Sequence, residues 1–280
     1  MVQKRIILAN DLSGIGKVAL TPAIPIMACC QIETILLPTI LLSSHTGGFQ
    51  QIAIQELLDF TKQSLEQWKV LHLKTDALFI GYCRQMEQLK VLLDYHITQN
   101  PDALLIVDPI MGDHGKLYSG FTEEYVDQMR SVCSKADVIL PNLTEAALLT
   151  QTEYLEGIQP VEAYQALARK LANLGAKKVI LTGIQTEVAS IGLLSYDAVT
   201  EQFATAFTSH YPHHFFGTGD IVSAILSACI LQGVSLEKAL STATTFLDVT
   251  LQETITQEKD LQYGVAFEPQ LHLLTQLFHS

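Results

Sequence analysis

The residues with the clearest chemical potential form the tetrapeptide Gly217-Thr218-Gly219-Asp220, which leads directly into an apolar run at 221–226. Glycines let the backbone approach a ligand closely, and the first turn of a helix offers unpaired amides and a partial positive charge. Such amides stabilise the charge of a transferring phosphoryl group, and an aspartate beside them can accept a proton from an attacking hydroxyl. The structural alternative is that Asp220 caps the helix and the glycines form a turn.

A second acidic and glycine-rich segment, DPIMGDHGKLY at 108–118, follows an apolar run in the middle of the chain. Its carboxylates, Asp108 and Asp113, suit a magnesium-bound polyphosphate, because Mg²⁺ prefers oxygen ligands and keeps several waters. The motif PNLTEA at 141–146 adds Asn142 and Glu145, which lie one helical turn apart and can point at one metal–phosphate cluster. A solvated loop is the alternative for the first motif, and a capping box is the alternative for the second.

The elements that must position these residues alternate between short apolar runs and longer amphipathic ones. We expect strands at 5–9, 34–37, 77–81, 104–108, 138–140 and 179–182, and an antiparallel hairpin at 189–196 and 202–206. We expect helices at 55–69, 85–98, 122–135, 160–174, 221–232 and 236–253. No linker, composition break or repeat divides the chain. The pattern therefore predicts one α/β domain over residues 1–280, with a mostly parallel central sheet.

The ends of the predicted strands carry most of the polar and glycine-rich interruptions. In an open α/β sheet, ligands bind beyond the carboxyl ends of the strands, so these residues are expected at one rim. They are Asn10, His45, Thr46, Gly47, Tyr82, Asp108, Asn142, Thr182 and Gly183.

Composition excludes several classes of protein. The net charge of −12 argues against nucleic acid as a partner, and no apolar stretch is long enough to cross a membrane. The five cysteines form no C-x-x-C pair, and the N-terminal segment has no signal-peptide cleavage pattern. We expect a soluble, reduced, intracellular protein.

One motif favours a different class of enzyme. Gly14-x-Gly16-x-x-Ala19 fits the dinucleotide fingerprint of a Rossmann oxidoreductase that binds NAD. However, Glu33 precedes the second apolar run instead of ending it. Prolines 22 and 25 also fall in the helix that should pack tightly on the sheet. The chain has no G-x-x-x-x-G-K-[S/T] and no G-x-S-x-G motif, and His213-His214 lacks the spacing of a metal site.

Taken together, GTGD, DPIMGDHGKLY, PNLTEA and SSHTGG at 43–48 resemble the ribokinase superfamily, and within it the pyridoxal and pyridoxamine kinases. The resemblance extends over almost the whole chain, from Ile6 to residues 263–265. It implies a ribokinase-like three-layer fold with helices on both faces of the sheet. It also implies a cytoplasmic homodimer that uses ATP and Mg²⁺ to phosphorylate the 5′-hydroxymethyl group of a vitamin B6 compound. A monovalent cation is a further candidate cofactor.

The resemblance also implies roles for individual residues. Asp220 would be the general base, and the amides of Gly217, Thr218 and Gly219 would form the anion hole. The metal and nucleotide side would comprise Asp108, Asp113 and Glu145 as metal ligands, with Asn142, Thr182 and Gly183. The heterocycle side would comprise Asn10, His45, Thr46, Gly47 and Tyr82.

The segment at 10–14 departs from this pattern, because it partly resembles hydroxymethylpyrimidine kinases, whose substrate is therefore an alternative. The sequence Leu181-Thr182-Gly183-Ile184 stands where those enzymes typically carry a KGGH-like stretch, which favours the pyridine.

Overall fold

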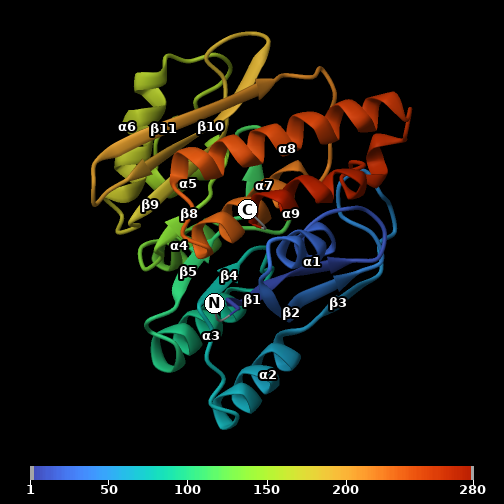
Figure 1. Cartoon of the computed structure of the whole chain (residues 1–280). Helices are drawn as coiled ribbons and strands as arrows, with labels where there is room; N and C mark the ends of the chain where they lie inside the picture. Colours follow the sequence, from blue (N-terminus) through green and yellow to red (C-terminus); the bar gives the residue numbers. More distant parts are fainter. Residues whose placement is uncertain (1–2, 279–280) are drawn as a thin grey trace.

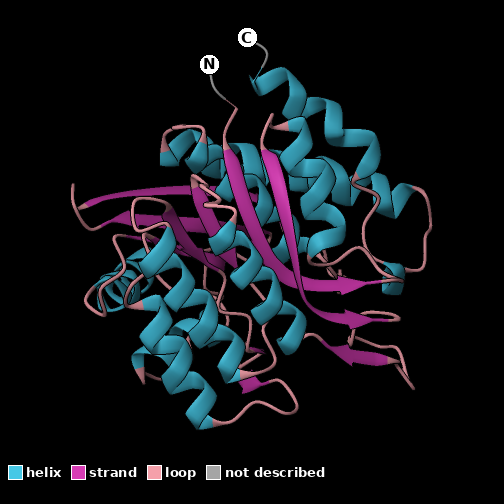
Figure 2. Ribbon diagram, turned by 90° about the horizontal axis from the view of Figure 1, so that it is seen from below, coloured by secondary structure: helices cyan, strands magenta, loops and turns pink. Residues whose placement is uncertain are grey.

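A nine-stranded sheet, parallel over most of its width, runs through the molecule, with helices on both faces (Figures 1 and 2). The structure is a computed structural model, and it describes residues 3–278. The strand order is β11-β10-β9-β8-β5-β4-β1-β2-β3. The strands are β1 (Arg5–Ser13), β2 (Glu33–Leu42), β3 (Ile54–Glu56), β4 (Ala77–Ile80), β5 (Leu104–Val107), β8 (Val138–Ile139), β9 (Lys178–Ile184), β10 (Ser190–Asp197) and β11 (Gln202–Ser209).

The strands from β2 to β9 pair in parallel, whereas β3, β10 and β11 are added antiparallel at the two edges. Strand β1 lies between β2 and β4, so the chain leaves it first toward one side of the sheet and later toward the other. Ligands of open α/β sheets bind at such a switch point, beyond the carboxyl ends of the strands. The fold therefore predicts a site above the ends of β1, β2 and β4.

Neighbouring residues of the central strands pack into two different cores, because successive side chains of a strand point to opposite faces. Ile7 belongs to the core under one helical layer, and Ile6 belongs to the core under the other. The first layer contains α2 (Leu58–Val70), α3 (Met86–Gln99), α4 (Glu123–Cys133), α5 (Leu143–Thr150) and α6 (Val161–Ala172). The second layer contains α1 (Leu20–Cys29), α7 (Thr218–Leu231), α8 (Leu236–Thr256) and α9 (Leu271–Phe278). Short 3₁₀ turns, η1 (Leu261–Tyr263) and η2 (Glu268–Gln270), precede α9.

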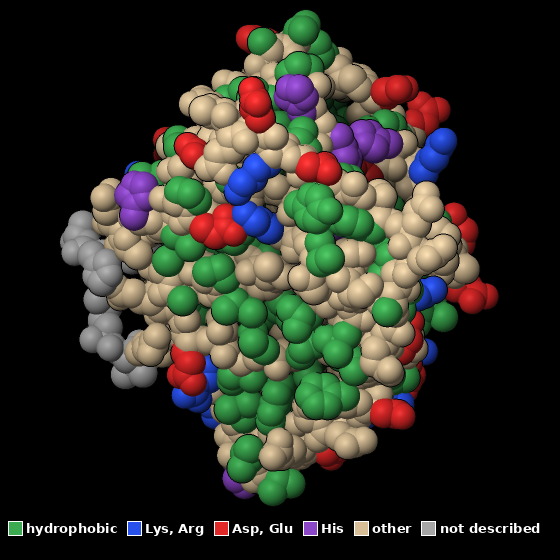
Figure 3. All heavy atoms as spheres, turned by 90° about the vertical axis from the view of Figure 1, so that its right-hand side faces the viewer, with side chains coloured by type: hydrophobic (Ala, Val, Ile, Leu, Met, Phe, Trp, Pro, Cys, Tyr) green, Lys and Arg blue, Asp and Glu red, His purple; other side chains and the backbone are tan. Residues whose placement is uncertain are grey.

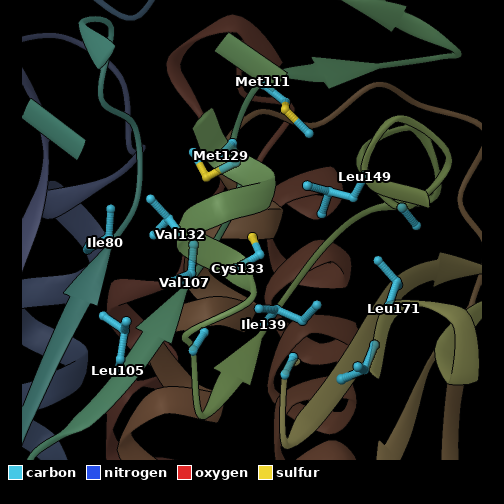
Figure 4. Close-up of a cluster of buried hydrophobic side chains, with 14 of the residues drawn as sticks. Ile80, Leu105, Val107, Met111, Met129, Val132, Cys133, Ile139, Leu149 and Leu171 are labelled. Carbon is cyan, nitrogen blue, oxygen red and sulfur yellow. The ribbon is translucent and has the colours of Figure 1, made fainter. Parts of the chain in front are cut away.

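Figure 4 shows the first core, where Val107 of β5 and Ile139 of β8 lie near Val132 and Cys133 of α4. These four side chains are at most 1% exposed. This core supports the strand ends that carry the acidic motifs. Within residues 3–278, no helix combines the length and apolarity that crossing a bilayer requires.

The structure differs from the predicted elements in several places: it extends the first strand to Ser13 and adds the helices α5 and α9. The helix predicted over 55–69 is wrong at its start, because Ile54–Glu56 forms β3 against the end of β2. The strand predicted at 34–37 continues through Pro38 to Leu42. Proline cannot donate to a ladder, and the β1–β2 register shifts just beyond it, between Asn10 and Leu12. Finally, α7 begins at Thr218 rather than at 221, which places Asp220 in the first turn of the helix.

Candidate active site

The start of α7 is shaped by a glycine that no other residue could replace without strain. Gly217 is the N-cap and has a positive φ of 84°. A Cβ atom there would lie 1.9 Å from the carbonyl oxygen of Lys17. By contrast, no atom lies within 4 Å of the Cβ position of Gly219, which is exposed. The backbone at Gly219 is therefore not covered by side chains of other segments, which leaves room for an anion at the start of this helix.

Asp220 lies in this first turn, and the nearby backbone N–H of Ala19 stabilises the ionised form of its carboxyl. Burial raises the pKa of Asp220 to about 6, and the Ala19 amide limits that rise. The group is therefore mostly ionised at pH 7 and close to its titration range, as a general base should be. Ala19 itself has a φ of 51°, an uncommon conformation for a residue with a side chain.

Asp108, at the end of β5, lies next to the first turn of α7. Its side chain accepts a 2.6 Å hydrogen bond from the Ser223 hydroxyl, and the residue is only 7% exposed. Burial and the charge of Asp220 raise the pKa of Asp108 to about 7, against the opposing effect of the Ser223 bond. The structure thus brings two residues from separate motifs, Asp108 and Asp220, into electrostatic contact.

Asp11 is a third acid at this place, and the sequence analysis assigned it no role. It is 7% exposed, and its carboxylate accepts a hydrogen bond of 3.1 Å from Ser13. Burial and the charge of Asp220 raise the pKa of Asp11 to about 7. Its position directly after Asn10, at the end of the first strand, was the only signal in the sequence.

The hairpin formed by β6 (Gly112–Asp113) and β7 (Lys116–Leu117) is fastened to α5 by the predicted pair Asn142 and Glu145. These two residues form a reciprocal capping box. The amide Nδ2 of Asn142 also donates to the carbonyl of Gly112 at 2.8 Å. The capping box, which was the structural alternative for the PNLTEA motif, is therefore present in the molecule.

Glu145 has no free carboxylate oxygen in this arrangement. Oε2 accepts from the backbone of Asn142 at 2.8 Å, and Oε1 accepts from the backbone of Met111 at 3.2 Å. The residue is 3% exposed, and burial together with the charge of Asp108 raises its pKa well above the usual range. Its assignment as a metal ligand stays a prediction.

Asp113 differs from Glu145 because its side chain is 43% exposed. One carboxylate oxygen accepts from the backbone of His114 at 2.7 Å. Among the described residues, no three histidine, cysteine or acidic side chains form a group that could enclose a metal ion. A magnesium ion that keeps most of its waters needs only one or two carboxylates, and Asp108 and Asp113 fit that requirement.

Tyr118 was named in the sequence analysis only as the last residue of the motif DPIMGDHGKLY. Burial raises the pKa of its hydroxyl, and so do the charges of Glu145, Asp113, Asp108 and Asp220, in that order. The phenol is therefore a neutral hydrogen-bond donor among four acids. Its place at the end of the GDHGKLY hairpin could have suggested this role.

The predicted nucleotide-side residues lie at the neighbouring strand. The backbone N–H of Thr182 donates to the carbonyl of Pro141 at 3.0 Å, and Thr182 forms an isolated parallel bridge with Asn142. Gly183 is exposed, has a φ of 76°, and has open space at its Cβ position. The structure thus brings Thr182 and Asn142 together at one rim.

On the heterocycle side, Asn10 fixes the position of Tyr82. Its Oδ1 accepts from the backbone of Asp11 at 3.0 Å and from the backbone of Tyr82 at 2.8 Å. A Cβ atom on Gly81 would lie 2.6 Å from that oxygen, so a glycine is needed there. The Tyr82 ring meets Phe121 edge-on, with centroids 5.7 Å apart. Asn10 is thus occupied in holding two strand ends, with Nδ2 left for other contacts.

The segment at 44–49, which follows β2, contains both exposed and buried residues. Thr46 is exposed, whereas His45 is 4% exposed and lies between the rings of Phe49 and Phe216. Gly47 packs against Phe216, since a Cβ atom on it would come within 2.2 Å of that ring. The segment therefore reaches the residue immediately before Gly217.

Of two hollows in the described part of the chain, the smaller lies where these residues meet. A cavity of about 10 Å³, the size of one water, is lined by Asn10, Ala19 and Asp220 together with apolar side chains of β1, β4, α1 and α7. It joins the heterocycle side to the predicted base. A larger hollow of about 410 Å³ lies at the amino ends of the strands, beside Lys4, Asp76 and Asn100, and none of the predicted site residues lines it.

The chain is similar to known kinases in sequence and in structure. A family model described as phosphomethylpyrimidine kinase (Phos_pyr_kin) matches residues 31–264. A pyridoxine/pyridoxal/pyridoxamine kinase from Bordetella avium (strain 197N) is 33% identical over 183 residues, which span 61% of this chain and 58% of that protein. The crystal structure of pyridoxal kinase from Lactobacillus plantarum is 32% identical, with a TM-score of 0.90 and coverage of 99% of this chain and 98% of that chain.

A further crystal structure, from Bacteroides thetaiotaomicron VPI-5482, is of a protein assigned as a phosphomethylpyrimidine kinase, in a crystal form with pyridoxal. It is 32% identical, with a TM-score of 0.91, and the match covers 97% of this chain and 96% of that chain.

The layered fold and the acids gathered beside the α7 N-terminus define a kinase of the ribokinase superfamily. The chain belongs to the phosphomethylpyrimidine kinase family. The alternative of an NAD-dependent oxidoreductase is therefore wrong. The parallel strands of a Rossmann oxidoreductase follow the order 3-2-1-4-5-6, whereas the parallel strands of this chain follow the order β2-β1-β4-β5-β8-β9. The glycine segment at 14–19 instead brings the Ala19 amide to Asp220.

Proposed function

We propose that this protein transfers the γ-phosphoryl group of ATP to the 5′-hydroxymethyl group of a vitamin B6 compound. The observation that carries the proposal is the position of Asp220, an acid with a pKa of about 6, in the first turn of a helix beside the exposed Gly219. Two relatives at 32% identity support the substrate class, since one is a pyridoxal kinase and the other was crystallised with pyridoxal.

In this mechanism Asp220 accepts the hydroxyl proton as the substrate oxygen attacks the γ-phosphorus. The bond from that phosphorus to the bridging β–γ oxygen breaks, and ADP leaves with the electron pair. The amides of Gly217, Thr218 and Gly219 stabilise the negative charge spread over the transferring group. The Ala19 amide keeps Asp220 ionised and oriented.

Magnesium would neutralise charge on the ATP phosphates when bound. Asp108 and Asp113 would hold the ion, directly or through its waters, while Glu145 would hold the hairpin that carries Asp113. Tyr118 would donate its proton in a hydrogen bond to a phosphate oxygen. Thr182 and Gly183 would border the nucleotide, together with Asn142, and a monovalent cation is a further candidate on that side.

On the other side, the heterocycle would lie against the face of Tyr82, within reach of the exposed Thr46 and of Asn10 Nδ2. A hydroxymethylpyrimidine is the alternative substrate. The family description, the segment at 10–14 and the buried acid Asp11 favour that reading.

One measurement separates these substrates: ATP consumption by the purified protein with pyridoxal, pyridoxamine, pyridoxine, hydroxymethylpyrimidine and a simple sugar. We expect turnover with at least one B6 compound, at a kcat/KM at least tenfold above that for the pyrimidine. Turnover of the pyrimidine alone would overturn the proposal in favour of the alternative.

We also propose a cytoplasmic homodimer. All five cysteines are free thiols in the structure, as in a reducing compartment. Figure 3 shows hydrophobic side chains gathered on the face that carries β2, β3 and α2, where Leu36, Leu41, Ile54 and Phe60 are 38–51% exposed. Apolar side chains next to an edge strand fit a second copy of the chain. Light scattering of the wild type and of Ile54→Asp tests this, and a monomeric wild type would contradict it.

A further inference from the structure

His45 has no ring nitrogen left for a ligand. Its Nδ1 accepts a hydrogen bond from the backbone N–H of Gly47 at 3.1 Å. Nε2 must therefore carry the ring proton, which it donates to the carbonyl of Gln262 at 2.7 Å. At 4% exposure, the ring is enclosed by protein rather than directed at a substrate.

The ring is in tight contact with two segments next to the base. A Cβ atom on Gly16 would come within 2.2 Å of the His45 ring, so the segment at 14–19 lies directly against it. On another side the His45 ring packs on Phe216, with centroids 4.7 Å apart. Phe216 is the residue immediately before Gly217, the N-cap of α7.

Two routes lead from His45 to Asp220. The backbone N–H of His45 donates to the carbonyl of Ile15 at 3.1 Å, and the segment at 14–19 ends at Ala19, which lines one small cavity together with Asp220. The second route passes through Phe216 to Gly217, which packs against the backbone of Lys17 in the same segment. The first route begins at the backbone of His45 and the second at its ring, and both end at the predicted base and its anion hole.

We propose that His45 is a positioning residue that holds the segments at 14–19 and 215–217 in register with the C-terminal turn at Gln262. It thereby fixes the Ala19 amide on Asp220 and the amides that receive the phosphoryl group. This inference rests on the proposed phosphoryl transfer, and it replaces the predicted contact between His45 and the heterocycle. The two roles differ in the kinetic constant that each controls.

The test compares three variants with the wild type. His45→Phe keeps the ring volume and loses both hydrogen bonds, whereas His45→Gln retains a donor that reaches toward Gln262. His210→Phe is the matched control, because His210 is exposed and outside the site. For His45→Phe we expect kcat to fall 10- to 100-fold while the KM values for ATP and the heterocycle stay within about twofold. His45→Gln should recover part of the loss, and the control should match the wild type.

A several-fold rise in the KM for the heterocycle with kcat preserved would mean that His45 contacts the substrate, and would overturn the proposal. A lowered melting temperature with both constants unchanged would overturn it too, since His45 would then only stabilise the fold.

A readout without turnover separates this inference from the proposed function. Hydrogen exchange of the amides at 14–19 and 215–219 should be faster in His45→Phe than in the wild type and the His210→Phe control. Unchanged exchange of these amides would contradict the positioning role of His45 even if the enzyme is active. If the wild type phosphorylates none of the B6 compounds, the proposed substrate fails, while the exchange experiment still decides the role of His45.

Discussion

The backbone N–H of Ala19 lies near the carboxylate of Asp220 and stabilises its ionised form, which couples the loop after the first strand to the first turn of α7, some 200 residues later in the chain. Burial raises the pKa of this carboxyl, the Ala19 amide and the amide of Asp220 itself lower it, and the result is a value of about 6. A base with this value is ionised at neutral pH and still able to take up a proton.

Replacing Asp220 with asparagine should abolish most turnover and leave ATP binding intact. Loss of a general base typically lowers kcat by a factor of about 10²–10⁴. Steady-state kinetics and calorimetric titration with ATP check the two halves of this prediction. Near-native turnover of Asp220→Asn would mean that Asp220 is only a helix-terminal residue.

The pH dependence of kcat follows from the same group. Because Asp220 must be deprotonated to accept the hydroxyl proton, kcat should be constant above about pH 7 and fall about tenfold per pH unit well below its pKa of about 6. Rates measured between pH 4.5 and 8.5 at saturating substrate check this. A rate that holds constant down to pH 4.5 would exclude Asp220 as the base.

Stability should change with pH in the opposite direction to activity. Burial raises the pKa of Asp11 from 3.8 to about 7, so between these values the folded protein binds more protons than the unfolded chain. The free energy of unfolding should therefore decrease as the pH rises through this range, by roughly 4 kcal/mol for such a group. Asp11→Asn should raise the melting temperature at pH 8 and have little effect at pH 4. Equal effects at both pH values would contradict the shift.

Glu145→Gln should increase the magnesium concentration needed for half-maximal rate several-fold, with a smaller effect on the KM of the heterocycle. The variant replaces one of the two oxygens that accept from the backbone of Met111 and of Asn142 with an amide that can only donate. Glu162→Gln, an exposed position on α6, is the control. If a folded Glu145→Gln protein needs the same magnesium concentration as the wild type, Glu145 has no part in magnesium binding.

Thr46→Ala and Tyr82→Ala should each raise the KM of the heterocycle several-fold and leave the KM of ATP nearly unchanged. Thr46 is exposed after β2, and the Tyr82 backbone is fixed by Asn10 and by a 2.6 Å bond from the Thr39 hydroxyl to its carbonyl. Initial-rate kinetics with each substrate varied in turn provide the test. Equal damage to both KM values would indicate that these residues support the fold instead.

The sequence by itself determined the features whose causes are local. Alternating apolar runs predicted the layered α/β fold, and the antiparallel hairpin at β10 and β11 is confirmed. Gly217 could be singled out because a tight turn before a helix favours glycine, and Asn142 with Glu145 because a capping box is formed within four residues.

Only the tertiary structure decided which partner each polar group takes. The ring of His45 donates to the carbonyl of Gln262, 217 residues further along the chain, a partner that no local pattern in the sequence indicates. Asp11 became an acid of the site only because strand pairing and α7 bring it near Asp220. A side chain's type fixes what it can donate or accept, but its partner depends on which distant segments the folded core packs together.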